Sequence, residues 1–361
     1  MLANSVGSIL RCLRDPVYGV GCSASFQGTL SSLNAFGNMA ALLIAGYLPY
    51  AIGKKNSAVL MGSCEYIGLF LIIFTGNPVL LAVAFALCGL GRGTISNVTN
   101  VIVGECTENK TAGLNLLHAT FAVGAVLSPL AFALIDISKW KIPVAITAVL
   151  LVFAFVLMST STLSNAKTLK IEQSSEFPKE FRFWNNVIIL FFYLSAETSL
   201  MSYIVSYFSY NGIFSDAVSN VMSSVLWLSI LTGRLAVAFV SKKAKKIRII
   251  FILGAFMFVS LVLMLVSKSK ILSAVSVAML GLSMSGIYPT TLSTQDDKYN
   301  KSTSATGICL SAATMGSIIY PSIAGFISDR YGYSSGMKSL LVPVVLMFVF
   351  IIIKALRERR A

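Results

Sequence analysis

The sequence predicts an all-helical protein that crosses a membrane about a dozen times. Of its 361 residues, 56% are hydrophobic and only 12% are charged, whereas about a quarter of the residues in soluble domains carry a charge. A helix needs about 20 mostly apolar residues to cross the hydrocarbon layer, and such stretches recur along this chain between short polar breaks. Because backbone amides in lipid must be satisfied within their own segment, we expect each stretch to be a helix.

Eleven stretches are long enough to be complete transmembrane helices. They cover residues 27–50, 57–75, 79–103, 112–136, 142–163, 186–208, 217–240, 247–267, 271–293, 304–327 and 337–356. The apolar start, Met1 to Leu10, spans only about 15 Å as a helix, which is half of the hydrocarbon thickness. We expect it to be the end of a truncated twelfth helix, because it lacks the basic start and cleavage site of a signal peptide.

The positive charges are concentrated on one side of this arrangement. The net charge of +14 does not indicate a nucleic-acid partner, because the basic residues lie in the breaks between apolar stretches. If the polar segment 164–185 lies inside, 18 of the 28 Lys and Arg residues fall on the inner side and eight on the outer side. The positive-inside rule therefore predicts a multi-pass protein of the cell (inner) membrane with a cytoplasmic C-terminus.

The chain is predicted to consist of two halves of six helices. Residues 164–185 form its one long polar stretch and separate a bundle in 1–163 from a bundle in 186–361. At an offset of 192 residues, Gly89-Leu90 aligns with Gly281-Leu282, and Pro129 aligns with Pro321. Such spacing indicates a parallel internal repeat.

Rows of polar side chains within the apolar stretches mark candidate binding residues, since polar groups are expensive in hydrocarbon. One face of the second helix carries amides and a hydroxyl at helical spacing: Gln27, Ser31, Asn34 and Asn38. This face lines a cavity or packs against another helix, and both interpretations stay open. Asn97 and Asn100 favour a cavity, because amides add donors and acceptors that close packing does not require.

Four further residues are candidates for contact with a solute. Asn115 and His118 are neighbours on one helix face, and His118, the only histidine in the chain, either relays a proton or is bonded to a neighbouring helix. Tyr203 belongs to an interfacial aromatic belt or stacks on a sugar ring. Tyr288 precedes Pro289, which lacks an amide and so either kinks the helix or opens it beside a cavity.

Four charged residues fall well inside apolar stretches, away from their ends. Glu65 and Arg92 lie at similar depths on neighbouring helices, which predicts an internal ion pair with a structural or gating role. Arg234 is placed nearer the cytoplasmic end of its helix. Glu197 has no obvious basic partner and is the candidate for proton coupling, although a neutral, hydrogen-bonded glutamate with no such role is the alternative.

Motifs for enzymatic chemistry are missing from the sequence. There is no Walker motif, GxSxG or HExxH, and the six cysteines include no CxxC pair. We therefore expect no enzyme activity, cofactor or metal site.

Four segments resemble the major facilitator superfamily, and within it the fucose-permease-like sugar group. They are residues 46–55, 89–100, 115–129 and 285–290. The resemblance implies two six-helix bundles that rock around a central site. Its sugar–proton members have carboxylates in helices one and four, where this chain has Asn4 and the asparagines already named. Proton coupling is therefore absent or has moved to Glu197.

Three functional hypotheses remain open at this stage. The first is secondary active transport of a small polar solute, a sugar, across the cell membrane by alternating access, with or without proton symport. The second is efflux of amphipathic compounds, and the third is a non-transporting truncated product. Membrane lipid is an expected partner, and the resemblance implies a monomer.

Overall fold

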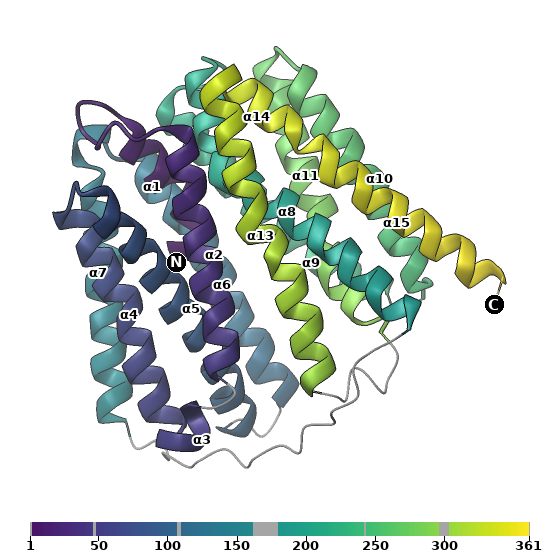
Figure 1. Ribbon diagram of the computed structural model, residues 1–361, viewed down its shortest axis with the longest axis horizontal. Helices are drawn as coiled ribbons and strands as arrows, with labels where there is room; N and C mark the ends of the chain where they lie inside the picture. Colours follow the sequence, from purple (N-terminus) through teal and green to yellow (C-terminus); the bar gives the residue numbers. More distant parts are fainter. Residues whose placement is uncertain are drawn as a thin grey trace.

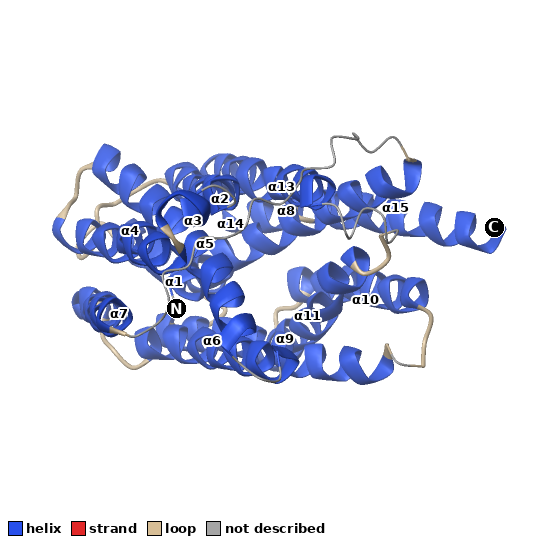
Figure 2. Ribbon diagram, turned by 90° about the horizontal axis from the view of Figure 1, so that it is seen from below, coloured by secondary structure: helices blue, strands red, loops and turns tan. Residues whose placement is uncertain are grey.

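The computed structural model describes residues 2–45, 48–106, 110–161, 180–241, 243–295 and 303–360. Its helices run nearly side by side (Figure 1), and the described residues contain helices and loops only (Figure 2). The helices are α1 (Leu2–Arg14), α2 (Ala24–Ala45), α3 (Leu48–Ile52), α4 (Lys54–Phe74), α5 (Pro78–Cys106), α6 (Lys110–Ala133), η1 (Ile137–Lys139), α7 (Lys141–Thr160), α8 (Phe181–Tyr210), α9 (Asp216–Val240), α10 (Lys246–Val266), α11 (Lys270–Leu292), α13 (Thr303–Tyr331), α14 (Tyr333–Ser339) and α15 (Leu341–Arg360).

The predicted all-α membrane fold is confirmed. Each of the eleven predicted stretches coincides with a helix, and nine helical segments of the described chain are long and apolar enough to cross a membrane. Large apolar side chains point outward from them, among them Phe153, 60% exposed, and Ile252, 55% exposed. Such a surface suits lipid rather than water.

Two groups of helices make up the molecule, and they meet where α2 packs against α13, α6 against α9 and α1 against α8. In the first group, α1 to α7, α5 packs against α2 and α4, and α7 packs against α4. In the second, α8 to α15, α8 packs against α13 and α15, while α11 packs against α9 and α10. We refer to these groups as the N half and the C half. The predicted boundaries at 163 and 186 stay a prediction, since most of the segment between them lies outside the described residues.

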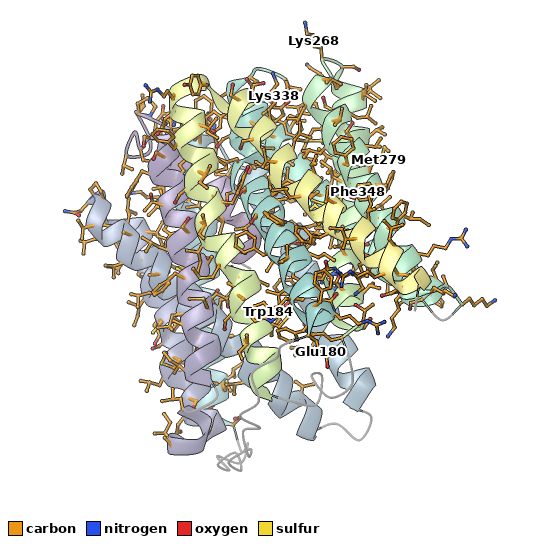
Figure 3. All side chains as sticks on the ribbon, turned by 45° about the vertical axis from the view of Figure 1, so that its right-hand side comes forward. Glu180, Trp184, Lys268, Met279, Lys338 and Phe348 are labelled. Atoms are coloured by element: carbon orange, nitrogen blue, oxygen red, sulfur yellow. The ribbon has the colours of Figure 1, made fainter. Side chains whose placement is uncertain are left out.

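The helix directions define two faces of the molecule. We name the end where α7 stops and α8 starts the linker face, and α15 also ends there. The opposite end, where α1 leads into α2, is the far face. Lys268 and Lys338 lie toward the far face, and Glu180 and Trp184 lie toward the linker face (Figure 3).

Glycines allow the N-half helices to approach closely. A side chain at Gly89 of α5 would collide with the backbone of Asn34 on α2, and one at Gly37 of α2 would collide with the carbonyl of Ala86 on α5. Because lipid provides no hydrophobic force between helices, close packing of this kind is a main source of their association. The two glycines therefore fix the distance between α2 and α5.

We predict that Gly89→Val lowers the thermal stability of the detergent-solubilised protein. The added methyl groups would push α2 from α5 and cost about 1–3 kcal/mol, the usual range for overpacking. The control is Gly76→Val in the loop before α5, where an added Cβ would meet only Val20 at an ordinary 3.5 Å. Equal melting temperatures for the two variants would contradict the packing assignment.

Candidate functional site

A large cavity lies between the two halves. Its volume is about 1010 Å³, at the upper end of the roughly 300–1,000 Å³ typical of small-molecule pockets. Its walls come from α1, α2, α4, α5, α6 and α7 of the N half and from α8, α9, α11 and α13 of the C half. Thr99, about two turns from the end of α5, and Leu310, about two turns from the start of α13, both line it. The cavity therefore extends toward the linker face.

Hydroxyl groups and an indole ring make much of this cavity suitable for a polar ring. Trp227 of α9 lines the wall, and its ring meets Phe121 of α6 edge to face at a centroid distance of 6.3 Å. Around them, short hydroxyl side chains line the cavity from both halves, among them Ser96, Thr99, Thr198, Ser202, Thr314 and Ser317. Hydroxyls donate and accept hydrogen bonds without adding charge, so the lining favours polar over ionic ligands.

The predicted intramembrane charges all face this cavity. They are two carboxyls and two guanidiniums, contributed by Glu65, Arg92, Glu197 and Arg234. With all four ionised, these side chains sum to zero charge. The described charges of the wall therefore do not select for an anion or a cation.

Glu197 is held by its own helix. The hydroxyl of Tyr193, one turn earlier on α8, lies 2.7 Å from a carboxyl oxygen of Glu197. Arg234 of α9 also acts on Glu197 electrostatically, although the two do not form a direct ion pair among the described residues. The sequence shows no obvious basic partner for Glu197, and the packing of α8 and α9 brings Arg234 to the same cavity without a direct ion pair.

Glu65 and Arg92 lie on tightly packed helices. A side chain at Gly91 would collide with the backbone of Glu65, and the thiol of Cys88 donates to the Glu65 carbonyl at 3.6 Å. The Glu65 and Arg92 charges interact, but the described chain has no direct ion pair between them. Both side chains reach the cavity, and their structural or gating role stays a prediction.

The amides of α2 divide between the cavity and the far face. Asn34 and Asn38 line the cavity, and the Asn34 amide also donates to the Phe85 carbonyl at 3.0 Å. Gln27 lies toward the far face, where its amide donates to the carbonyl of Leu10 and its oxygen accepts from Tyr333 at 2.6 Å. Gln27 is thus engaged between helices and is not among the residues that line the cavity.

The two candidate tyrosines also differ in position. Tyr288 lines the cavity beside Pro289, and its ring lies 6.5 Å from that of Tyr193. Tyr203 is only 1% exposed, and its hydroxyl lies 2.8 Å from the Ala24 carbonyl. Tyr203 joins helices at the far face in this state rather than lining the cavity.

Four predicted binding residues cannot be compared with the cavity. The backbones of α5 and α6 include them, but their side chains lie outside the described part of the structure: Asn97, Asn100, Asn115 and His118. Their roles stay predictions.

Tyr193 and Trp227 line the cavity, although neither was predicted from the sequence as a site residue. A usable signal was present, because Trp227 precedes Arg234 by seven positions and Tyr193 precedes Glu197 by four. Both spacings place the aromatic ring on the helix face of the charged residue. Without a charged residue on the same face, an aromatic residue in an apolar helix does not indicate which face lines a cavity.

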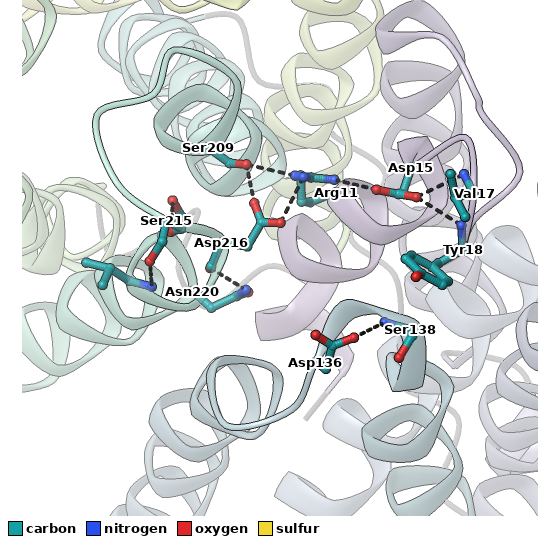
Figure 4. A network of polar contacts seen from close by, with 12 residues as sticks. Arg11, Asp15, Val17, Tyr18, Asp136, Ser138, Ser209, Ser215, Asp216 and Asn220 are labelled. Carbon is teal, nitrogen blue, oxygen red and sulfur yellow. Dashed lines mark hydrogen bonds and ion pairs between the residues drawn. The ribbon is translucent and has the colours of Figure 1, made fainter.

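At the far face, Arg11 of α1 joins the two halves (Figure 4). Its guanidinium donates to Asp216 at the start of α9 at 2.9 Å and to the Ser209 hydroxyl at 3.0 Å. Asp15 contacts the same guanidinium at 3.8 Å. Only 10% of the Arg11 side chain is exposed, so solvent screens this network less than a surface ion pair.

Asp329, near the end of α13, forms a second connection. Its carboxylate accepts from the backbone amides of Ala24 and Ser25 at 2.6 Å each, and from Arg14 at 3.4 Å. These amides belong to the first turn of α2, which has no helical partner for them. A C-half carboxylate therefore caps an N-half helix.

Bonds between the halves cluster on one side of the cavity. Ser31 meets Ser202 at 2.6 Å and Ser32 meets Ser322 at 2.9 Å, and the contacts of Arg11, Asp329 and Gln27 described above lie at the same far-face end. The cavity is therefore sealed toward the far face and continues toward the linker face.

These features define a class of protein: a multi-pass membrane protein with a polar cavity between two helical halves, closed at one end. The model of the major facilitator superfamily matches residues 17–308, and the chain belongs to this family. The predicted membership is confirmed. Members of this family are transporters rather than enzymes, as expected.

Individual relatives are distant. The chain is 22% identical over 343 residues to sodium-dependent glucose transporter 1 of Homo sapiens, covering 82% of this chain and 65% of that protein. It is 22% identical over 326 residues to the glucose/mannose transporter GlcP of Bacillus subtilis (strain 168), covering 85% and 79%. The chain thus spans about two thirds of the human relative's length.

Solved structures share the fold. The nucleoside transporter NupG superposes with a TM-score of 0.72 at 13% identity, with 97% of each chain covered. A D-xylose-proton symporter superposes with a TM-score of 0.77 at 13% identity, covering 97% of this chain and 95% of that one. At such identities the likeness concerns the arrangement of helices.

We predict that Asp329→Ala opens the far face. The variant loses two charge-assisted bonds to α2 and one to Arg14, and bonds of this kind each contribute about 1.5–3 kcal/mol. We expect at least a tenfold shift toward a state with the far ends of the halves apart. Electron-spin distances between labels at the exposed positions Val17 and Lys268 measure it.

The matched control for this experiment is Asp136→Ala. Asp136 also accepts from a backbone amide near the far face, that of Ser138 at 2.9 Å, but both residues belong to the N half. In Asp136→Ala, the distribution of distances between the two labels should equal that of the protein with native Asp136. An unchanged distribution in Asp329→Ala would show that the carboxylate does not hold the seal.

Proposed function

We propose that this protein is a secondary active transporter that moves a small neutral polar solute, a sugar, across the cell membrane by alternating access. The observation that carries this proposal is the polar cavity between the halves, sealed at the far face and continuing toward the linker face. If the halves rock about this cavity, breaking the far-face bonds exposes the same site to the other side. The solute then reaches both sides of the membrane through the same cavity, without a separate channel.

The cavity chemistry supports a sugar over a charged metabolite. With Glu197 ionised, the four charged side chains of the described wall cancel, so an ionic solute gains no net attraction in that form of the cavity. The hydroxyls and the Asn38 amide offer donors and acceptors from several directions, as polyhydroxylated solutes require. Trp227 adds a flat apolar surface on which the CH face of a sugar ring can lie.

The relatives support the same substrate class. The names of the similar proteins include two glucose transporters, one of which also carries mannose in its name, and a xylose–proton symporter. Because these proteins are distant, we transfer the sugar class rather than any one sugar. A driving ion is part of the proposal, and protons and sodium are both represented among the names.

Protons are the coupling ion that the cavity favours. Glu197 is a half-buried carboxyl that faces the cavity and is joined to Tyr193 rather than to a direct ion-pair partner. A carboxyl in this setting exchanges a proton with water entering the cavity more readily than one in a direct ion pair. We assign Glu197 the role of proton carrier.

The charge distribution supports one orientation. We place the linker face and the C-terminus in the cytoplasm of the cell, since 18 of the 28 Lys and Arg residues fall on the predicted inner side of the sequence. In this orientation the cavity continues toward the cytoplasm and the far face is sealed against the exterior. Surrounding lipid and a monomeric state complete the proposal.

Uptake by proteoliposomes tests the proposed function. Purified protein is reconstituted and offered a panel of labelled hexoses and pentoses, with and without an inward proton gradient, and with sodium in place of protons. We expect accumulation of at least one sugar above equilibrium only with the proton gradient. Resistance to amphipathic drugs on overexpression, without sugar uptake, would favour the efflux alternative, and activity in neither assay would favour a non-transporting product.

We predict that Glu197→Gln abolishes accumulation driven by the proton gradient and retains exchange of labelled for unlabelled sugar. The amide keeps the shape and hydrogen bonding of the carboxyl but cannot carry the proton. The control is Glu358→Gln, at an exposed carboxyl near the end of α15, which should accumulate sugar normally. Gradient-driven accumulation by Glu197→Gln would remove Glu197 from the coupling mechanism.

A further inference from the structure

The hydroxyl of Tyr193 lies between two oxygen atoms that can each accept a hydrogen bond from it. One is Oε1 of Glu197 on the same helix, at 2.7 Å, and the other is the backbone carbonyl of Met284 on α11, at 2.9 Å. Tyr193 is 2% exposed, so bulk water does not replace either contact. The hydroxyl is thus the link between Glu197 and α11.

The number of hydrogens in this chain of contacts depends on Glu197. A tyrosine hydroxyl donates one hydrogen, and a backbone carbonyl only accepts. If Glu197 is ionised, one hydrogen serves two acceptors. If Glu197 is protonated, it donates to the Tyr193 oxygen, Tyr193 donates to Met284, and both short contacts are hydrogen bonds.

Tyr203 shows why the carboxyl matters. Its hydroxyl also lies near two acceptors, the carbonyls of Ala24 at 2.8 Å and Pro321 at 3.0 Å. Neither carbonyl can supply a hydrogen, so there the single hydrogen is shared. At Tyr193 one of the two acceptors is a carboxyl that can carry the missing hydrogen itself.

We propose that Tyr193 is a positioning residue that links the proton on Glu197 to α11, and that Glu197 holds this proton in the state sealed at the far face. The inference rests on the proposed proton coupling and adds to it a protonation state and a mechanical connection. Tyr193 keeps its own hydrogen throughout and does not ionise.

Release of the proton rearranges the link. The O–H bond of Glu197 breaks, its electron pair stays on the carboxylate, and the proton passes to water in the cavity. The Tyr193 hydrogen then turns from Met284 to the new carboxylate, because a charged acceptor forms the stronger bond. The Met284 carbonyl loses the tyrosine donor and keeps only the amide donor of its own helix, so α11 loses a bond to α8.

Helix α11 is already weakened next to this point. Pro289 has no amide hydrogen, so the Ser285 carbonyl, adjacent to Met284, lacks its usual helical donor. Met284 and Tyr288 on the same segment line the cavity, and α11 continues to Leu292 near the linker face. Loss of the Tyr193 bond therefore frees α11 where its own hydrogen bonding is incomplete.

Other ionisable groups around Glu197 set the conditions for this step. On the packed helices, Arg234 of α9 acts on Glu197 directly, and Tyr288 of α11 faces it. Across the cavity lie Glu65 and Arg92. The described cavity residues of α13 are Leu310, Thr314 and Ser317, and the described cavity residue of α1 is Val6. None of these side chains ionises near neutral pH.

Infrared difference spectroscopy on the purified protein without any solute tests the inference. At pH 7, the spectrum of the unmodified protein minus that of Glu197→Gln should show the carbonyl stretch of a neutral carboxylic acid. In Tyr193→Phe this band should shift to higher frequency, because Glu197 loses the oxygen to which it donates. In proteoliposomes, Tyr193→Phe should reduce gradient-driven sugar accumulation at least tenfold relative to exchange.

The matched control is Tyr207→Phe. Tyr207 is a buried tyrosine of the same helix whose hydroxyl lies 3.4 Å from the Met264 carbonyl, and it does not line the cavity. In Tyr207→Phe, the carbonyl stretch of Glu197 should stay at the frequency of the unmodified protein. This control separates loss of the specific bond from a general effect of removing a buried hydroxyl.

Two outcomes would overturn the inference. If Glu197→Gln removes no neutral carboxyl band at pH 7, Glu197 is not protonated in this state. If the band is present but Tyr193→Phe leaves it unmoved, Tyr193 is not its partner. Both infrared measurements are made without sugar. A failure to transport any sugar would therefore contradict the proposed function, and the infrared result would still test the role of Tyr193.

Discussion

The structure depends on one constraint: within the hydrocarbon layer, every polar group must contact another helix or reach a wet cavity. The polar residues of α2 show both solutions on one helix. Toward the far face, Gln27 bonds with Leu10 and Tyr333, and Ser31 bonds with Ser202 across the two halves. Deeper along the helix, Asn38 lines the cavity. The seal and the cavity are therefore made from one polar stripe.

The far-face seal combines charge with backbone capping. Asp329 satisfies amides at the start of α2 that no residue of that helix can satisfy, and Arg11 brings α1 to the start of α9. Both contacts join helix ends, where unpaired backbone groups and charges gather. Rocking of the halves breaks bonds at these ends without disturbing the glycine packing inside the N half.

Much of the fold and part of the site could be predicted from the sequence. Apolar length predicted the helices, and the cost of burying charge singled out Glu65, Arg92, Glu197 and Arg234, all of which line the cavity in the structure. Gln27 and Tyr203 follow the same sequence logic, yet they lie in helix contacts. Helical spacing predicts the helix face on which a residue lies. The depth of that residue relative to the far-face seal depends on how the two halves pack against each other.

The sequence by itself determined the class of protein, because segment length and hydropathy are local properties that the bilayer imposes on each helix separately. Only the tertiary structure decided which polar residues hold the halves together and which face the cavity. Arg234 beside Glu197, and Tyr193 between Glu197 and Met284, depend on helix pairs far apart in the chain. Such contacts follow from the packing of α8, α9 and α11, which no single segment encodes.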